Sequence, residues 1–441
     1  MKLNTPTAPV HNHEGVRAKH INPEQQLRRS VMACMLWESE FYEDGKAIAA
    51  RISETIKIVR PEAVAAIAVE AREKMKLRHV PLLIVREMAR LATHRALVAE
   101  TLARVIQRPD ELAEFLAIYW KEKRQPLSAQ VKRGLAQAFL KFDSYALAKY
   151  NRDGAIKLRD VLFLCHAKAA TPEQDAIWKQ LIAGTLPTPD TWEVALSAAT
   201  GATDAEKAAA KLAVWTRILA EKKLGALALL RNLRNMEQVN VDDAAIRKAL
   251  TEIKTERVLP FRFIAAARHA PRMEPELEIG MFRCLEGRAK LPGKTLLLVD
   301  TSPSMAQKVS EKSELSRKDA AFGLAVLLRE LCASVEIVAF SRITGTVPPR
   351  RGFALADAIA NAVPSDGTLL GNAVRSVAGR YDRLVVISDE ESQDAVTDPD
   401  AGKQAYMINV ASSKNGVGYG AWLHVDGWSE AVVDYIAVIE G

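Results

Sequence analysis

The sequence predicts a multidomain protein in which an all-α part of helical repeats precedes a doubly wound α/β domain. Amphipathic helical spacing recurs, with almost no strand signal, from about residue 24 to residue 285. After Pro292 the pattern changes to short apolar runs that alternate with helices. A length of 441 residues leaves room for two or three domains. We expect an extended or disordered segment over residues 1–22, the helical repeats over 23–288 and the α/β domain over 289–441.

The helical part places apolar residues at the spacing of one helix face. Within residues 85–106 these positions are Met88, Leu91, Leu97, Leu102 and Ile106. This spacing predicts a helix over residues 85–106. Short breaks separate the predicted helices at residues 60–61, 79–81, 108–109, 125–126, 152–154 and 171–172. Because no repeat of fixed length is visible, we expect an irregular, HEAT-like stack of helical hairpins.

The α/β part begins with the apolar run Lys294–Asp300, which is too short for a helix and typical of a buried parallel strand. Helices and strands then alternate. The expected helices cover residues 315–332 and 354–363 and a segment after Gly367. The expected strands cover residues 335–340, 384–388, 405–410 and 423–425. In such a fold, ligands bind at the carboxyl ends of the strands.

The charge of the chain is unevenly distributed. Residues 290–441 carry 15 Lys and Arg against 19 Asp and Glu, whereas residues 1–289 carry 46 against 35. The basic first part predicts an anionic partner, and the acidic second part suits a cation. The sequence has no run of 18 apolar residues and no apolar core of a signal peptide, so we expect a cytoplasmic protein with no membrane partner.

A D-x-S-x-S motif follows the first predicted strand of the α/β part. Its carboxylate and hydroxyl oxygens are ligands that Mg²⁺ or another hard divalent cation prefers. Two later loops, after Gly367 and after the strand at 384–388, open on the same edge of a parallel sheet. The motif therefore offers Asp300, Ser302 and Ser304 as ligands, and the Gly367-Thr368 and Ser388-Asp389 loops supply candidates to complete the shell.

The alternative interpretation of this motif is purely structural. Ser302 and Ser304 could cap the following helix, and Asp389 could form a turn. The two residues that follow it, Glu390 and Glu391, are expected to face solvent.

The order of these motifs, D-x-S-x-S, then Gly-Thr, then Asp, resembles the metal-ion-dependent adhesion site (MIDAS) of von Willebrand factor A domains. Residues 23–29, 228–233 and 259–266 look like segments of the TROVE domain of the Ro autoantigen family, in which helical repeats precede an A domain. The chain is similar to a bacterial Ro orthologue in this respect. The resemblance implies a monomeric ring of helical repeats closed by the A domain, and no catalytic activity. It also implies a Mg²⁺ bound directly or through water by five residues, Asp300, Ser302, Ser304, Thr368 and Asp389.

The resemblance also implies RNA partners. Family members bind small Y RNAs on a basic outer surface and hold the 3′ single-stranded tails of misfolded noncoding RNA in a central hole. This implies a role in RNA quality control or processing, with a 3′ exonuclease such as polynucleotide phosphorylase as a partner. Residues 149–166 are similar to a family stretch that includes RNA-binding positions. The candidate RNA contacts are Lys121, Lys123, Arg124, Lys132, Arg133, Lys149, Arg152, Lys157, Arg159, His166 and Lys168.

A second class of function stays open at this point. The A domain could bind an acidic side chain through Mg²⁺ while the helical part binds protein, which would make the chain a protein-interaction scaffold. The salt dependence of binding separates the two classes, because neutralising phosphates makes binding fall steeply with salt.

Overall fold

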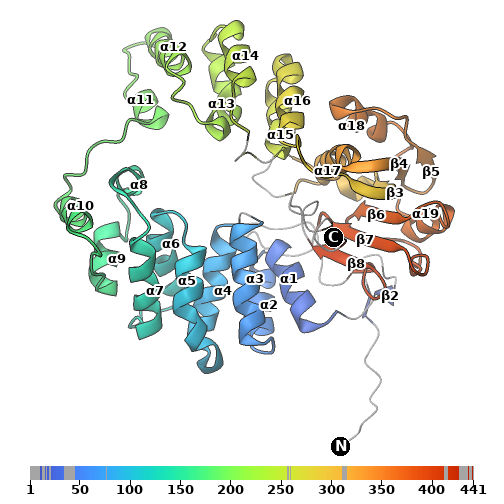
Figure 1. Cartoon of the computed structure of the whole chain (residues 1–441), viewed down its shortest axis with the longest axis horizontal. Helices are drawn as coiled ribbons and strands as arrows, with labels where there is room; N and C mark the ends of the chain where they lie inside the picture. The colour runs from blue at the N-terminus through green and yellow to red at the C-terminus, as the bar shows by residue number, and fades with distance from the viewer. Residues whose placement is uncertain are drawn as a thin grey trace, which may run out of the picture. The chain divides into compact units, whose positions relative to one another are not determined.

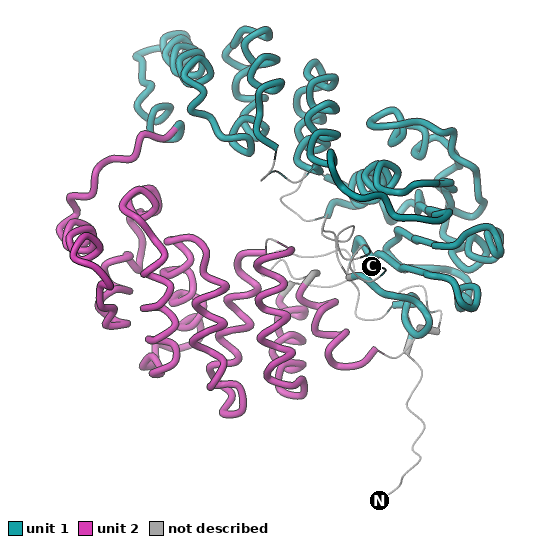
Figure 2. The backbone as a smooth tube through the Cα atoms, in the orientation of Figure 1, with its two compact units in different colours: residues 1–20, 192–441 teal, residues 21–191 magenta. Residues whose placement is uncertain are grey.

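The computed structural model describes residues 10–11, 15, 17–18, 21–33, 45–75, 77–255, 258, 260–309, 315–411, 416–426, 436 and 440. The chain forms two compact units, shown in Figure 2. Unit 2 comprises residues 21–191, and unit 1 comprises residues 1–20 with 192–441. The last helices of the predicted helical part therefore share a unit with the α/β domain, and the domain boundaries expected at residues 22 and 288 stay predictions.

Unit 2 consists of helices that pack on their neighbours around one apolar core (Figure 1). They are α1 (Pro23–Ala33), α2 (Gly45–Ile56), α3 (Pro61–Glu73), α4 (His79–Arg90), the 3-10 helix η1 (Ala92–Leu97), α5 (Val98–Val105), α6 (Asp110–Tyr119), α7 (Ala129–Phe139), α8 (Ser144–Tyr150), α9 (Leu158–Cys165) and α10 (Pro172–Ala183). The predicted breaks fall between these helices or at the start of one, except that the break at residues 79–81 forms the first turn of α4. Buried Arg72 and Glu111 form an ion pair that joins α3 to α6, with an N–O distance of 2.8 Å.

The single helix expected over residues 85–106 is wrong. The structure divides this stretch into the end of α4, η1 and α5. Leu91 causes the division, because its backbone is extended, with φ −99° and ψ 124°. The apolar residues Met88, Leu102 and Ile106 are nevertheless fully buried. The apolar spacing thus identified the core face but not the change of helix axis.

The helical portion of unit 1 leads into the sheet. It comprises α11 (Trp192–Ser197), α12 (Asp204–Ala220), α13 (Ala226–Gln238), α14 (Asp243–Thr251), α15 (Phe261–His269), the 3-10 helix η2 (Pro271–Met273) and α16 (Glu274–Arg283). The short strands β1 (Val10–His11) and β2 (Arg17–Ala18) form an antiparallel pair near the amino terminus. Across the described ranges of both units, no helix is long and apolar enough to cross a membrane.

The predicted doubly wound α/β domain is confirmed. Its strands are β3 (Leu291–Asp300), β4 (Cys332–Phe340), β5 (Thr344–Thr346), β6 (Arg383–Ser388), β7 (Gln404–Asn409) and β8 (Leu423–Asp426). They lie in the order β5-β4-β3-β6-β7-β8, and every pairing is parallel except that of β5 with β4. The sequence did not predict β5, an edge strand of three residues. The chain reverses its direction of winding between β3 and β6, which makes this position the topological switch point of the sheet.

Helices cover both faces of this sheet, as Figure 1 shows. They are the 3-10 helix η3 (Pro303–Ala306), α17 (Arg317–Leu331), α18 (Gly352–Ala360) and α19 (Leu370–Ser376). Leu297 and Val299 of β3 belong to the core beneath α17 and α18. Leu296 and Leu298 belong to the core beneath α19. This alternation is why β3 appears in the sequence as a continuous apolar run.

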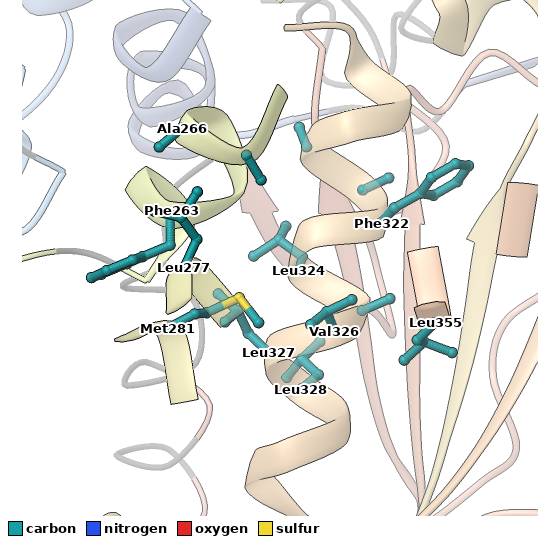
Figure 3. Packing of buried hydrophobic residues seen from close by; sticks show 14 of the residues in the cluster. Phe263, Ala266, Leu277, Met281, Phe322, Leu324, Val326, Leu327, Leu328 and Leu355 are labelled. Carbon is teal, nitrogen blue, oxygen red and sulfur yellow. The ribbon is translucent and has the colours of Figure 1, made fainter. Parts of the chain in front are cut away.

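The helical portion of unit 1 packs directly on the α/β domain. Figure 3 shows Met281 of α16 beside Leu327 and Leu328 of α17, and the Phe263 ring of α15 packs on Gly280 of α16 within the same core. Gly323 of α17 lets α17 and α15 approach each other closely, because a Cβ atom at Gly323 would lie 2.8 Å from the ring of Phe261 on α15. Arg268 of α15 also forms an ion pair with Asp319 of α17. A shared core and an ion pair therefore fix α15 and α16 against the sheet.

A buried arginine, Arg383, stabilises the sheet at the amino-terminal ends of its parallel strands. Arg383, at the start of β6, donates hydrogen bonds to the Thr295 hydroxyl at 2.7 Å and to the Pro292 carbonyl at 3.1 Å. Its guanidinium also pairs with Glu440, to which the Tyr406 hydroxyl donates a bond of 2.8 Å. These bonds fasten the end of the chain to the amino-terminal edge of the strands.

The contact between α16 and α18 generates a stability prediction. Glu278 of α16 accepts a 2.8 Å hydrogen bond from the Phe353 amide, and Gly352 beside it has φ +55°. A Cβ atom at Gly352 would overlap the Glu278 carboxylate. We expect Gly352→Ala to lower the free energy of unfolding by about 3 kcal/mol, from left-handed backbone strain plus the overlap. Denaturant unfolding of the variant measures this decrease.

Gly402 provides the control, because its φ is also positive, at +75°, but a Cβ atom there would meet open space. Gly402→Ala should therefore cost only the backbone strain, about 1 kcal/mol. Adding Glu278→Ala to Gly352→Ala should restore part of the stability. Equal destabilisation in the two glycine variants would contradict the role given to Glu278.

Candidate metal centre and basic surface

The predicted metal ligands gather at the topological switch point of the sheet. Asp300 ends β3, and Asp389 follows the last residue of β6, the strand beside it. Asp300, Ser302 and Asp389 are fully buried, Thr368 is 5% exposed, and Ser304 is half-buried. The sheet order therefore brings the D-x-S-x-S loop and the Asp389 loop to one edge, as the sequence predicted.

Hydrogen bonds orient the oxygen atoms of this edge. Asp300 Oδ1 accepts a 2.8 Å bond from the Ser302 amide, and Asp300 Oδ2 accepts a 2.7 Å bond from the Ser388 hydroxyl. The hydroxyl oxygens of Ser302 and Ser304 lie 3.2 Å apart. Ser302 precedes η3 without a side-chain cap bond, so the capping alternative is wrong for this residue. Its hydroxyl instead faces the second hydroxyl of the motif.

The third predicted loop, which carries Thr368, is bonded to the other two. The Ser365 hydroxyl donates a 2.7 Å bond to the Thr301 carbonyl, and the Gln393 amide donates a 2.9 Å bond to the Thr368 carbonyl. Gly367 has φ +148°, and a Cβ atom there would lie 2.7 Å from the Arg342 side chain. Glycine is therefore required beside Thr368 for this loop to reach the site.

The electrostatics of the edge suit a cation. Burial, together with the neighbouring charge of Asp389, raises the pKa of Asp300 to about 7. Asp389 accepts a 3.3 Å bond from the Glu391 amide, a turn contact that the structural alternative expects. Its other oxygen, Oδ2, lies 3.5 Å from Nη1 of the buried Arg317. Two buried carboxylates with hydroxyl oxygens around them form a donor set that fits Mg²⁺.

Among the described residues, no group of three or more His, Cys, Asp or Glu side chains is placed to hold a metal ion. The candidate site therefore depends on its hydroxyls as well as on its two carboxylates. The five candidate ligands have this composition, because they comprise two aspartates, two serines and one threonine.

The expectation that Glu390 and Glu391 face solvent is wrong, because both are buried. Glu390 Oε2 accepts a 2.9 Å bond from the Gly418 amide, and Oε1 contacts His424 Nε2. The His424 ring stacks on Tyr419 with a centroid distance of 3.9 Å. The segment around residues 417–424 covers this end of β6, a tertiary contact with no local sequence signal.

The candidate RNA contacts all lie in unit 2, between the end of α6 and the loop after α9. Exposed residues are Lys121, Lys123, Arg124, Arg133, Arg152, Arg159, His166 and Lys168. Lys132, Lys149 and Lys157 are half-buried. Lys157 pairs with Asp153 at 2.8 Å, and the Arg124 guanidinium lies 5.0 Å from the centre of the Trp120 ring.

The positive charge of unit 2 is concentrated in this segment. Residues 121–168 carry 11 Lys and Arg against 4 Asp and Glu, whereas the rest of residues 21–191 carries 16 against 17. Lys141 is the basic residue in the segment that the sequence interpretation left out. Its ammonium donates to the Ala103 and Ile106 carbonyls at the end of α5, so its role is structural. We call residues 121–168 the basic segment.

Sequence reasoning missed one feature of the basic segment. Phe163 on α9 is 57% exposed, and exposed Arg159 and His166 lie about one helical turn away on either side. Arg159 and Phe163 lie on one face of α9, and His166 follows the helix as its left-handed cap residue; we call these three exposed residues the exposed stripe of α9. An isolated apolar residue in a helix usually indicates core, so only the structure distinguishes Phe163 from its buried neighbours Val161 and Leu162.

We predict that the five candidate ligands form one divalent-cation site. A crystal soaked in Mn²⁺ should give a single anomalous peak between Asp300 and Asp389, because these carboxylates share one buried edge. Asp300→Asn should abolish that peak, whereas Asp382→Asn, at the exposed start of β6, should leave it unchanged. A peak at another place in unit 1 would contradict the assignment.

Comparisons with known proteins agree with these features. The TROVE domain matches residues 175–280, which include the segments 228–233 and 259–266 but not residues 23–29. The crystal structure of the Deinococcus radiodurans Ro (RSR) protein aligns with a TM-score of 0.64 and 19% identity, covering 95% of this chain and 100% of that one.

An aerotolerance-related membrane protein from Bacteroides fragilis aligns at 17% identity over 27% of this chain and 67% of its own, with a TM-score of 0.20, too low to establish a common fold. The comparison with curated proteins yields no match. The chain therefore combines a TROVE segment with the fold of a bacterial Ro protein, and the resemblance to the Ro family drawn from its sequence is confirmed.

Proposed function

We propose that the chain is a noncatalytic RNA-binding protein of the Ro type. The observation that carries this proposal is the basic segment, whose excess positive charge lies on exposed side chains of unit 2. Lysine and arginine neutralise phosphates without reading bases, so the segment suits an RNA backbone. In this proposal the bound RNAs are a small Y-like RNA and the 3′ tails of misfolded noncoding RNA.

The proposal places the two kinds of RNA at different parts of a monomeric ring. Stems of the Y-like RNA bind the basic outer surface, and single-stranded 3′ tails pass through a central hole too narrow for a duplex. The protein then acts in the cytoplasm, in RNA quality control or processing, with a 3′ exonuclease such as polynucleotide phosphorylase as its partner. The order of parts, TROVE segment before A domain, supports this arrangement.

Two features support the absence of catalysis. Burial raises the pKa of the Cys165 thiol to about 11 and also raises that of Cys332, which makes both poor nucleophiles at neutral pH. Glu390, a buried carboxylate of unit 1 beside the candidate metal site, is committed to His424 and the Gly418 amide. For the metal site, we propose that Asp300, Ser302, Ser304, Thr368 and Asp389 bind Mg²⁺ and that the site presents this ion to an acidic group of a partner.

We predict that the cations of the basic segment provide much of the RNA affinity. Replacing Lys132, Arg133, Arg152 and Arg159 together by Ala should weaken the binding of a tailed RNA. The slope of log K against log salt should flatten by about 0.7 for each single-strand phosphate that the variant no longer neutralises. Gel-shift titrations at several salt concentrations measure both effects.

A matched control uses basic residues of the same unit outside the segment. Lys57, Lys74, Arg104 and Lys179 are exposed, and their joint replacement by Ala removes the same charge from unit 2. RNA affinity and salt slope should then change much less. Equal weakening in the two quadruple variants would indicate attraction by net charge alone. If the chain instead binds a protein with an affinity that does not change with salt concentration, that result would favour the protein-interaction scaffold.

The exposed stripe of α9 makes a separate prediction about unpaired bases. A phenyl ring that is 57% exposed beside cations can stack on a base while Arg159 contacts phosphate. Phe163→Ala should weaken binding of a single-stranded tail by about 1–3 kcal/mol and leave blunt duplex binding unchanged. Phe163→Trp should keep the affinity. The same weakening for tailed and blunt RNA would contradict base stacking.

A further inference from the structure

A buried arginine lies beside the candidate metal ligands. Arg317 is the first residue of α17, and its Nη1 lies 3.5 Å from Asp389 Oδ2. The side chains are 1% and 0% exposed, so water screens the attraction little. The metal ligand Asp389 thus already faces a positive charge supplied by the chain itself.

The start of α17 is fixed, so this charge cannot easily move away. Ser316 and Asp319 form a capping box, with the Ser316 amide 2.7 Å from Asp319 Oδ2. The Arg317 amide donates a 2.8 Å bond to the Gln307 carbonyl. Asp319 also pairs with Arg268 of α15. Contacts on three sides therefore hold the backbone from which the guanidinium extends.

The other charges at this edge still leave room for a cation. Asp300 and Asp389 are two buried carboxylates, and Arg317 contributes one positive charge beside Asp389. Glu390 is paired separately with His424, which lies on β8. Negative charge thus remains in excess around Asp300 and Asp389, which is where a divalent cation would bind.

We propose that Arg317 is a positioning residue that acts as a resident counter-charge for the metal site. It holds the Asp389 carboxylate when no divalent cation is present, and it opposes a divalent cation when one binds. The site therefore stays folded without metal and binds metal less tightly than its ligands alone would allow. This inference rests on the metal site of the proposed function.

The test compares Arg317→Met with wild type by titrating Mn²⁺ alone and following its electron paramagnetic resonance signal. Removing the opposing charge should tighten Mn²⁺ binding by about tenfold or more. The thermal midpoint of Arg317→Met in a chelator should fall, and Mg²⁺ should restore it by more than it stabilises wild type. Arg317→Lys keeps the charge, so its Mn²⁺ affinity should stay within about threefold of wild type.

Arg383→Met is the matched control, because Arg383 is also a buried, paired arginine but lies at the opposite end of the strands. Its thermal midpoint should fall equally with and without Mg²⁺, and its Mn²⁺ affinity should not change.

Wild type that binds Mn²⁺ with the same affinity as Arg317→Met would overturn the counter-charge and leave the metal site intact. If neither protein binds Mn²⁺, the metal site itself is wrong, and the counter-charge with it. If Arg317→Met can be purified only in the presence of Mg²⁺, we expect the variant to unfold when a chelator removes the Mg²⁺. Retained stability after chelation would oppose the proposal.

Discussion

The adjacency of β3 and β6 brings two buried carboxylates together, and much of the surrounding structure follows from this constraint. Asp300 ends β3 and Asp389 directly follows the neighbouring strand β6, at the point where the sheet changes its winding direction. Charges of like sign in a buried place are costly unless cations or hydrogen-bond donors surround them. The Ser302 amide, the Ser388 hydroxyl and the Arg317 guanidinium supply that environment from three different segments.

The same constraint explains why α17 is so firmly held. Its first turn carries both Arg317, which faces Asp389, and Asp319, which pairs with Arg268. Its second turn packs at Gly323 against Phe261 of α15. Helix α17 thus connects the edge of the sheet that carries Asp300 and Asp389, here called the metal edge, to α15, which lies within the segment that matches the TROVE domain.

The sequence allowed the architecture to be predicted, and with it the meeting of the D-x-S-x-S loop and the Asp389 loop at one edge of the sheet, because both depend on local patterns. Buried parallel strands appear as short apolar runs, and D-x-S-x-S has a fixed spacing after the first of them. Features that depend on tertiary contact could not be predicted. Arg317 lies 13 residues after Ser304 in the sequence but beside Asp389 in space. The burial of Glu390 depends on Gly418 and His424, which lie far along the chain.

The two candidate binding surfaces differ in the physics that each requires. The basic segment has its charges exposed, so salt screens them and RNA can exchange between them. The metal edge has its charges buried, so salt screens them little and their arrangement is fixed by hydrogen bonds. A protein that uses both can regulate them separately, since ionic strength acts on the first and divalent-cation supply acts on the second. The positive excess of the chain lies in residues 1–289 and the negative excess in residues 290–441, so the α/β domain repels phosphate on average whereas the basic segment attracts it.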